Sequence, residues 1–547
     1  MTYAARRTPS RLTLLILAAV ALAGQTVLAQ QDSAGDESAR AQEEFYDPDT
    51  VQTVHLEVAD EDIRRMLAAL PKRIYVPATF RWGDVAIDRV AIRFKGNSSS
   101  SPEQRHKRSY LIKFSEYEKD QRFLGLRRIS LDNGVQFGSL FSEPIVTEIL
   151  RDQGIPTHRC NYAKLFVNDE YRGVYVNVER IDESFVESRF DGGKGALFKI
   201  DLGGPGANLQ FLGNDPALYG VAFEPKSKSA EKDAWPLVDF VRMVNKSSKS
   251  EFAANLESQF EVDDFLKIAS VMLFSGAFDQ LTGWNAHNYY LYHDPDEKRW
   301  RYLPWDLDVG FCEIAFGQIH VLADWNAAWP VPGNSQNPLL ERIIADPELL
   351  ARYRHSASLI LDEYFKPEQL CAKIDAKYAL IKADLENDPF PHQRATNRDK
   401  NFDEVVASQK DFVRKRYAAA REQLDNPGTR PKFARRQPQN RNEPMPGPAS
   451  KDDPTELRVV DSNSSGVKLE WKDNATAEAG HILQRAEGDK STEFRNYMGK
   501  PGDKISEATD PGVQSGKTYR YRVFAVRRTP RGPQGSGVSN VVTVRVE

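Results

Sequence analysis

The chain has little cysteine, no strong excess of either charge and few long apolar runs. Its 547 residues include three cysteines, Cys160, Cys312 and Cys371, none in a Cys-x-x-Cys pair or a Cys/His cluster with zinc spacing. The sequence therefore predicts neither a structural zinc site nor an essential disulfide, although the odd count leaves at least one thiol free. A formal net charge of −4 argues against a basic nucleic-acid-binding face.

The longest apolar run lies near the N-terminus. Arg6, Arg7 and Arg11 precede the run from Leu12 to Leu22, and small residues follow it. The run is shorter than the roughly 20 apolar residues that a transmembrane helix needs. We therefore predict that residues 1–29 are a signal peptide and that the protein is exported to the periplasm, the cell surface or the medium. An uncleaved membrane anchor is the alternative. No later segment reaches membrane-spanning length, so no membrane span is expected after cleavage.

The rest of the chain divides by composition. Residues 30–50 are polar and acidic, which predicts a flexible leader. Residues 51–425 alternate strand and helix patterns, with strands concentrated early and helices late, which is typical of an α+β domain. Residues 426–454 are rich in proline and predict an extended linker. Residues 455–547 carry short strand patterns separated by turns, which predict an all-β sandwich.

The periodicity within the α+β region predicts individual elements. Strands are expected at residues 109–114 and in a hairpin over residues 162–179. A helix is expected over residues 139–153, because Gly154 follows it as a C-cap signal. The strongly apolar stretch over residues 262–278 predicts a buried helix.

One polar constellation points to phosphate chemistry. Asp279 precedes Asn288, and the short strand from Trp300 ends in Asp306 and Asp308. Mg²⁺ prefers hard oxygen ligands, usually one or two carboxylates plus substrate phosphates. An acid, then an amide, then a strand pair ending in another acid is also the chain order of protein kinase sites. Asp and Asn are common turn residues as well, so turn chemistry is the alternative interpretation.

Two marks of ordinary protein kinases are missing. No Gly-x-Gly-x-x-Gly loop is present, and Ala277-Phe278 stand before Asp279 where a His-Arg pair would be expected. The turn Gly96-Asn97-Ser98-Ser99 offers backbone N–H groups and hydroxyls that can bind phosphate instead.

Several motifs together resemble the CotH kinase family, atypical kinases similar to spore coat protein H. They occur in the order of that family and are Arg93-Phe-Lys-Gly96-Asn97-Ser98-Ser99, Lys107-Arg-Ser-Tyr-Leu-Ile-Lys113, Asn288-Tyr-Tyr-Leu-Tyr292 and Pro304-Trp-Asp-Leu-Asp308. The resemblance implies a two-lobed, kinase-like core over residues 51–425. It implies ATP and Mg²⁺, with Mn²⁺ as an alternative, and an exported or surface protein as the acceptor. No nucleic-acid partner is implied.

The resemblance also implies roles for the polar constellation. Asp279 is expected to be the catalytic acid–base residue, which orients the acceptor hydroxyl and takes its proton. Asn288 is expected to be a metal ligand, although Asn285 has the spacing of the standard catalytic loop and remains a competitor. Asp306 is expected to bind the metal, with Asp308 sharing this role or supporting it.

A nucleotide needs further contacts. Lys113 is expected to contact the phosphates, with Lys107 as the alternative, and Glu148 or Glu143 on the following helix is expected to pair with that lysine. Ser98 is expected to bind phosphate. Glu179 is expected to lie beside the adenine.

The last region resembles a fibronectin type III domain. Trp471 stands where that family has its core tryptophan, and Gly516-Lys-Thr-Tyr519 matches the tyrosine-corner segment. Such modules bind or space other domains, so binding of another surface component is expected. Two other functions stay open for the whole chain. One is a non-catalytic surface or coat-assembly protein, and the other is a transferase that moves AMP.

Overall fold

The computed structural model divides into two compact units. The first comprises Met1–Gln210 and Ala222–Lys432, and the second comprises Phe211–Val221 and Phe433–Glu547. The description covers residues 37–96, 99–102, 107–135, 139–190, 193–201, 203–283, 286–315, 319–330, 337–390, 401–429, 446–463, 465–475, 480–498, 506–529 and 532–547. The predicted signal peptide and most of the proline-rich linker lie outside these residues.

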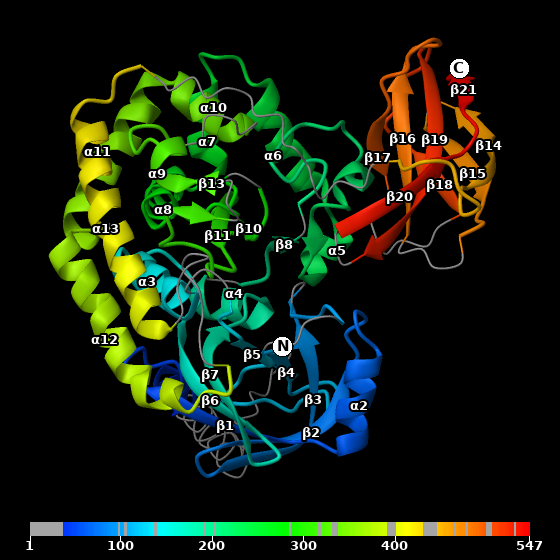
Figure 1. Ribbon diagram of the computed structural model, residues 1–547. Helices are drawn as coiled ribbons and strands as arrows, with labels where there is room; N and C mark the ends of the chain where they lie inside the picture. The colour runs from blue at the N-terminus through cyan, green and yellow to red at the C-terminus, as the bar shows by residue number, and fades with distance from the viewer. Residues whose placement is uncertain are drawn as a thin grey trace, which may run out of the picture. The chain divides into compact units, whose positions relative to one another are not determined.

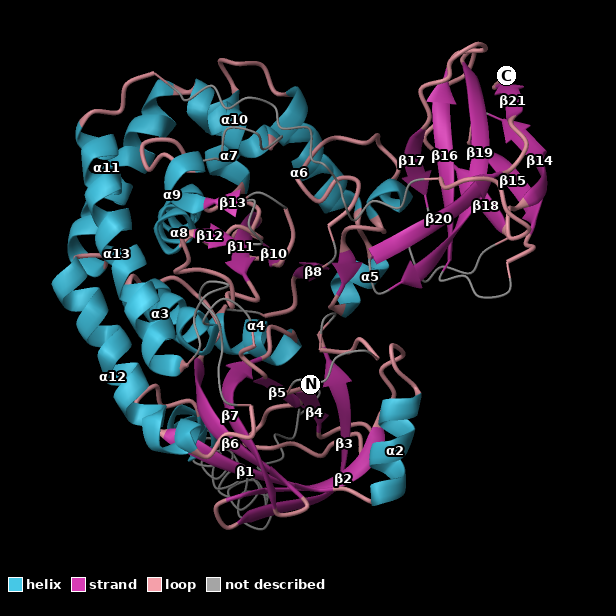
Figure 2. Ribbon diagram, in the orientation of Figure 1, coloured by secondary structure: helices cyan, strands magenta, loops and turns pink. Residues whose placement is uncertain are grey.

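A closed β-barrel forms the early part of the first unit (Figures 1 and 2). Its strand order is β1-β2-β3-β4-β5-β7-β6, and a parallel pairing of β1 with β6 closes it. The other neighbouring strands in the barrel pair antiparallel. The bounds are β1 Val51–Glu57, β2 Val76–Trp82, β3 Val85–Lys95, β4 Ser109–Lys113, β5 Arg128–Asp132, β6 Cys160–Val167 and β7 Glu170–Glu179.

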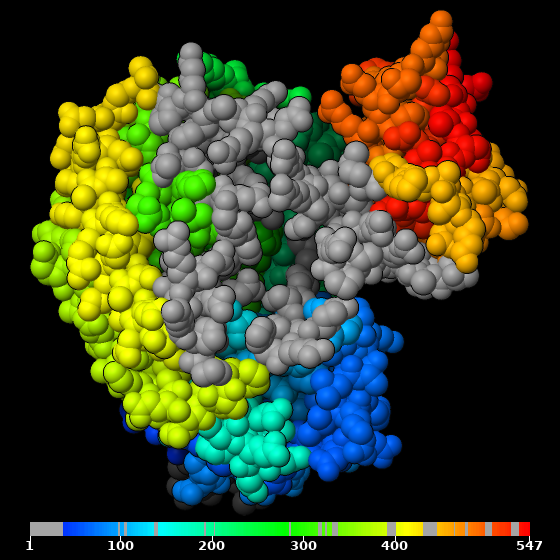
Figure 3. All heavy atoms as spheres, in the orientation of Figure 1, coloured from blue at the N-terminus to red at the C-terminus, as the bar shows by residue number. Residues whose placement is uncertain are grey.

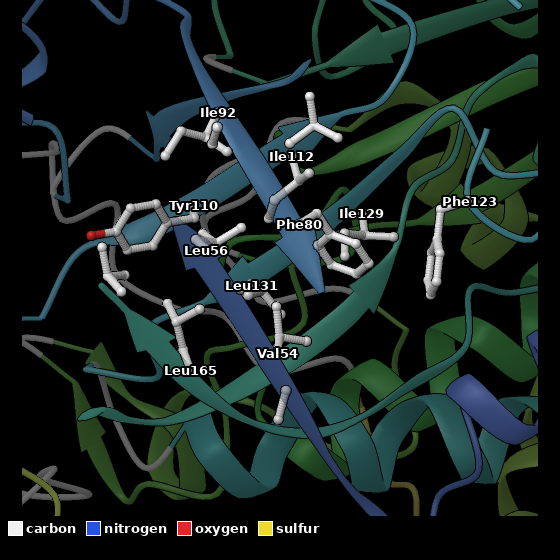
Figure 4. Close-up of a cluster of buried hydrophobic side chains, with 14 of the residues drawn as sticks. Val54, Leu56, Phe80, Ile92, Tyr110, Ile112, Phe123, Ile129, Leu131 and Leu165 are labelled. Carbon is white, nitrogen blue, oxygen red and sulfur yellow. The ribbon is translucent and has the colours of Figure 1, made fainter. Parts of the chain in front are cut away.

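Apolar side chains fill the barrel because alternate residues of each strand face inward. In β1, Val54 and Leu56 are fully buried while their neighbours are partly exposed. They meet Phe80, Ile112 and Ile129 from other strands (Figure 4). Full burial of each such side chain contributes about 1.5–3 kcal/mol. The alternation therefore leaves the outer face of the strands free for polar side chains.

Three of the described helices alternate with the barrel strands along the sequence. They are α2 Asp60–Ala68, α3 Ser139–Asp152 and α4 Glu183–Arg189. A further helical segment over residues 37–45 precedes β1. It ends at Phe45 and Tyr46, which are buried in the barrel core, and the Phe45 ring lies 4.9 Å from that of Phe123. The prediction of a flexible leader is therefore wrong for residues 37–50, because these two aromatic residues anchor the segment.

A smaller sheet follows the barrel, in the order β11-β10-β8-β9. Its strands are β8 Ala196–Ile200, β9 Glu224–Pro225, β10 Tyr289–Asp294 and β11 Arg299–Pro304. Two short strands, β12 Ile314–Ala315 and β13 Ile319–His320, pair separately.

Helices make up the rest of the first unit. They are α5 Lys228–Lys232, α6 Trp235–Lys246, α7 Phe252–Gln259, α8 Val262–Ser275, α9 Val321–Asp324, α10 Pro338–Ala345, α11 Pro347–Tyr364, α12 Pro367–Glu386 and α13 Phe402–Asp425. The predicted buried helix is α8, which ends at Gly276 in the left-handed conformation (φ 77°). Helices α12 and α13 pack on one another and form the yellow to yellow-green surface of Figure 3.

The second unit is all-β apart from the short 3-10 helix Pro216–Tyr219. One sheet has the order β14-β15-β18, and another has β17-β16-β19-β20 with β21 also paired to β19. Trp471, Tyr519 and Tyr521 lie in its core. The strands are β14 Thr455–Asn463, β15 Gly466–Lys472, β16 Gly480–Glu487, β17 Arg495–Met498, β18 Glu507–Asp510, β19 Thr518–Thr529, β20 Gly532–Val538 and β21 Val542–Arg545.

The α+β class of the chain is confirmed, while kinase-like lobes and a fibronectin-type domain stay predictions. Among the residues that the structure describes, no helix has both the length and the apolar character that crossing a membrane requires.

Candidate functional site

A cavity of about 700 Å³ lies in the first unit, against the outer face of the barrel. The alternation in β3 explains its polar wall, because Ile92 and Phe94 point into the core while Arg93 and Lys95 point outward and line the cavity. Residues from the small sheet and from the segments after α8 and β11 complete the lining. The acidic members are Asp132, Asp201, Glu224, Asp279, Asp306 and Asp308, and the basic members are Arg73, Arg93, Lys95, Arg128, Arg180, Lys199 and Lys226.

The hairpin of β10 and β11 brings the predicted acids and amide together. Tyr289 pairs with Pro304, so Asn288 and Trp305 come side by side, and the Trp305 N–H donates to the Asn288 carbonyl at 3.0 Å. The Asn288 side-chain amide then donates to Asp279 Oδ2 at 2.9 Å. Asp306 and Asp308 follow on the same cavity wall. The structure thus gathers four residues that are 29 positions apart at most.

Two of these four residues have an unusual backbone. Asn288 has φ 57° and Asp306 has φ 58°, both in the left-handed region. Asn and Asp tolerate this region better than most residues, yet it still carries a conformational cost. Non-glycine residues in this region cluster at functional sites, where the surrounding structure holds them. Both residues lie where the chain enters or leaves the hairpin, which aims their side chains at the cavity.

The carboxyl groups on this wall repel one another. Burial, and then the charge of Asp306, raise the pKa of Asp279 well above its usual range, against a smaller opposing effect of the Asn288 hydrogen bond. Burial raises the pKa of Asp306 to about 6, although Lys95 partly offsets it. Burial, followed by Asp306 and Asp279, raises the pKa of Asp308. Like charges held this close favour a bound cation, which would relieve the repulsion.

Glu143 supports this wall from behind. It is buried on α3, accepts from the Leu307 N–H at 3.4 Å and lies 3.0 Å from Nε2 of the buried His158. It therefore holds the backbone between Asp306 and Asp308. Neither Glu143 nor Glu148 pairs with a predicted phosphate lysine. Glu148 instead accepts from Lys373 at 2.8 Å and also pairs with Lys377, because its side of α3 faces α12.

Basic residues line the same cavity. Lys95 pairs with Asp132, and Lys199 donates to Asp201 at 2.6 Å. Burial, and then Arg180, lower the pKa of Lys199 to about 8. Lys95 stands at a variable position of the motif from Arg93 to Ser99 and was not among the predicted site residues. Lys199 and Arg180 had no sequence signal beyond their charge.

The two predicted phosphate lysines lie elsewhere. Lys113 shares the outer face with Leu111, but it stands at the far end of β4, where it pairs with Glu116. In the register of β3 with β4, Ser109 is opposite Lys95, so Lys95 and not Lys113 reaches the cavity end. Lys107 is 1% exposed and donates to Asp388 at 2.7 Å and to the Val174 carbonyl at 2.6 Å. Neither lysine is among the described residues that line the cavity.

The structure places the predicted adenine contact, Glu179, away from the cavity. Glu179 is 2% exposed and accepts from Arg159 and Arg189, so the structure places it in a buried ion-pair network instead of the cavity. Ser98 and Asn285 lie outside the described residues. Ser99, next to Ser98, does line the cavity and accepts from the Ser109 N–H at 2.7 Å.

A metal ion fits the acidic wall only with help from a ligand. Within the described ranges, no group of three or more His, Cys, Asp or Glu side chains is arranged to hold a metal ion. Mg²⁺ commonly takes one or two protein carboxylates and completes its shell with phosphates and water. The carboxylates of Asp306 and Asp308, with the side-chain oxygen of Asn288, are oxygen ligands of the right chemistry for this arrangement.

Comparisons with known proteins agree with the motifs. The model of the family described as CotH kinase protein matches residues 92–420. The chain is 23% identical over 336 residues to Inner spore coat protein H of Bacillus subtilis (strain 168), covering 61% of this chain and 87% of that protein.

Two of the matching solved structures cover small parts of the chain. A myokine structure is 13% identical over 18% of this chain and 98% of that chain, with a TM-score of 0.15. A crystal structure of titin domains is 18% identical over 17% of this chain and 31% of that chain, with a TM-score of 0.14. Scores this low carry no argument about the fold.

Proposed function

The chain belongs to the CotH kinase protein family, and from this premise we propose that it is an ATP-dependent protein kinase. It would transfer a phosphoryl group to Ser or Thr side chains of exported or surface proteins. The observation that carries the proposal is one cavity whose lining combines the carboxylates of Asp279, Asp306 and Asp308 with the ammonium groups of Lys95 and Lys199. Phosphoryl transfer needs metal-binding carboxylates and phosphate-binding cations in the same site.

Asp279 takes the role of acid–base residue. The acceptor oxygen attacks the γ-phosphorus, the bond from that phosphorus to the bridging oxygen breaks, and ADP leaves with the bonding electrons. The hydroxyl proton passes to Asp279, whose Oδ1 lacks a hydrogen-bond partner among the described residues while Oδ2 is held by Asn288. A carboxylate with one oxygen fixed and one free is suited to orient a hydroxyl.

Asp306 and Asp308 would hold a divalent metal together with the phosphates, with Asn288 as a further oxygen ligand. A bound Mg²⁺ or Mn²⁺ supplies neutralisation of the charge on the transferred group. Lys95 and Lys199 supply the matching positive charge in the same cavity, where partial burial strengthens their attraction for phosphate. Glu143 keeps the Asp306–Asp308 backbone in place.

Export and partners complete the proposal. The sequence predicts a signal peptide, and the relative is named as an inner spore coat protein. Both support a location outside the cytoplasm and an acceptor among exported or coat proteins. We propose that the second unit, with its fibronectin-like pattern, binds another surface component and takes no part in the chemistry.

The test uses the full chain from Gln30 with ATP labelled at the γ or α phosphate, in Mg²⁺ or Mn²⁺, beside Asp306→Ala. Transfer of the γ label to protein, lost in Asp306→Ala, is the expected result. Transfer of the α label would show a nucleotidyl transferase instead. Absence of both labels together with absence of nucleotide binding by calorimetry would favour the non-catalytic surface protein.

A further inference from the structure

Arg180 differs from the other cations around the cavity. It follows β7 directly, is partly buried and lines the cavity. Lys95 and Lys199 have carboxylate partners, and Arg128 lies 3.7 Å from Asp182. For Arg180, the structure gives no hydrogen bond or ion pair from the guanidinium to any described residue, although several acids lie near enough to interact electrostatically. A guanidinium with five donors and no partner has its binding capacity intact.

The backbone aims this side chain at the cavity. Glu179, one residue earlier, is locked in the opposite direction by Arg159 and Arg189. Asp182, two residues later, caps α4 by accepting from the Ser184 N–H at 3.0 Å. Successive residues of an extended segment point to opposite sides. Arg180 is therefore held between two fixed neighbours and projects away from the Glu179 network.

A tryptophan face fixes the guanidinium. The Arg180 guanidinium carbon lies 4.4 Å from the centroid of a Trp305 ring, while Lys95 Nζ and Lys199 Nζ lie 5.8 Å and 5.7 Å from the indole. Trp305 is itself rigid, because Gln280 donates to its carbonyl at 2.8 Å and its N–H bonds to Asn288. Stacking on an aromatic face holds an arginine without using its N–H donors.

We propose that Arg180, laid across Trp305, binds the phosphate chain of the nucleotide, with Lys95 and Lys199 beside it. A planar guanidinium matches two phosphate oxygens at once, which a lysine cannot do. Trp305 precedes Asp306 in the chain, so one short segment aims the phosphate-binding arginine and supplies a metal-binding carboxylate. This inference rests on the proposed function, since it names the phosphate contact of the same cavity.

The experiment measures binding of tripolyphosphate by calorimetry, without metal, to the full chain from Gln30. The Arg180→Met variant should bind tripolyphosphate roughly 10- to 100-fold more weakly, because it loses a bidentate, charge-assisted contact. Arg180→Lys keeps the charge but loses the fork, so it should recover only part of that loss. Methylguanidinium ion added to Arg180→Ala should restore part of the affinity.

Arg93→Met is the matched control, since Arg93 also lines the cavity but already donates to the Phe94 carbonyl at 3.0 Å. It should change the affinity less than about 3-fold. Trp305→Leu, with Arg180 intact, should weaken binding to an intermediate degree because the guanidinium loses its platform.

Different results would overturn the role of Arg180 and the kinase activity. Unchanged tripolyphosphate affinity in a folded Arg180→Met, or an equal loss in Arg93→Met, overturns the assignment of Arg180 even where ATP is still turned over. Tripolyphosphate binding that depends on Arg180, together with no transfer of any label from ATP, supports Arg180 and removes the kinase proposal.

Discussion

Lys107 and Asp388 form a fully buried charge pair, whereas the carboxylates around Asp306 are half-buried at the cavity. Each oxygen of Asp388 is occupied, because Oδ2 accepts from Lys107 and from the Val174 N–H at 2.9 Å and Oδ1 accepts from the Phe390 N–H at 2.8 Å. Only glycine fits at position 173, because a Cβ there would lie 2.3 Å from the Asp388 carboxylate. Around Asp306, the acids lie together on the lining of a cavity and their pKa values rise.

The difference separates structural charge from functional charge. Lys107 and Asp388 join the start of β4 to the end of α12, and satisfied buried charges of this kind hold parts of a fold in register. Asp279 Oδ1 has no hydrogen-bond partner among the residues that the structure describes, and the acids of the cavity repel one another. This state costs stability, and a bound cation or substrate relieves it.

Asp279→Asn should lower turnover about 10²- to 10⁴-fold, because the acceptor proton loses its base. Nucleotide affinity should stay within about 3-fold, since the phosphate and metal contacts come from other residues. Single-turnover kinetics and calorimetry measure the two effects. Asp294→Asn is the control, because Asp294 is a buried acid on the same hairpin that does not line the cavity. Near-normal phosphate transfer by Asp279→Asn would falsify the role of this residue.

Lys107→Met should destabilise the first unit by about 3–5 kcal/mol, since it leaves Asp388 as an unpaired buried charge. Chemical denaturation monitored by the fluorescence of Trp305 and its neighbours measures the loss. Lys373→Met in α12 is the control, because Lys373 is 32% exposed and its pair with Glu148 should contribute about 0–1 kcal/mol. Equal effects of the two changes would show that the Lys107 pair is not a structural anchor.

Asp510→Asn should weaken the second unit by about 1.5–3 kcal/mol, the usual contribution of hydrogen bonds to a charged group. Asp510 is fully buried and accepts from Tyr497 and Tyr521, each at 2.6 Å, and from Arg485 at 3.0 Å. Hydrogen exchange should speed up in β16 and β19 only. Nucleotide affinity should not change, and a marked loss would contradict the assignment of the chemistry to the first unit.

Nucleotide affinity should fall about tenfold between pH 7 and pH 9. The protonated form of Lys199 attracts phosphate, and burial together with Arg180 lowers the pKa of this lysine to about 8. The charge is therefore present below pH 8 and is lost as the pH rises through that value. Lys199→Arg stays protonated and should remove most of the dependence, while Lys226→Arg should retain it. Titration calorimetry at several pH values decides between the two results.

Local patterns predicted many elements well. The alternation in residues 109–114 and the Gly154 signal after residues 139–153 correspond to β4 and α3, and the hairpin over residues 162–179 corresponds to β6 and β7. The acids and the amide of the site also came from chain order, since Asp279, Asn288, Asp306 and Asp308 do line one cavity. These features are short-range or carried by motifs, so the sequence contains them directly.

The cationic side of the site was predicted less well. Lys113 and Lys95 are both lysines on outward-facing strand positions, and only the register of β3 with β4 shows which one reaches the cavity. Glu179 and Arg180 are consecutive charged residues, yet Glu179 is paired with Arg159 and Arg189 while Arg180 lines the cavity. Such choices depend on residues brought together from distant parts of the chain.

The sequence alone therefore indicates the family and the α+β class, and it proposes the acids for the chemistry, because motifs, periodicity and residue type are local properties. Tertiary structure decides which charges are neutralised and which face the cavity. Lys107 is neutralised by Asp388, which lies 281 positions away in the chain. Arg180 can still bind a ligand, because Trp305 stacks on it without using its N–H donors. Burial and electrostatic pairing act through space, and chain order does not record distance in space.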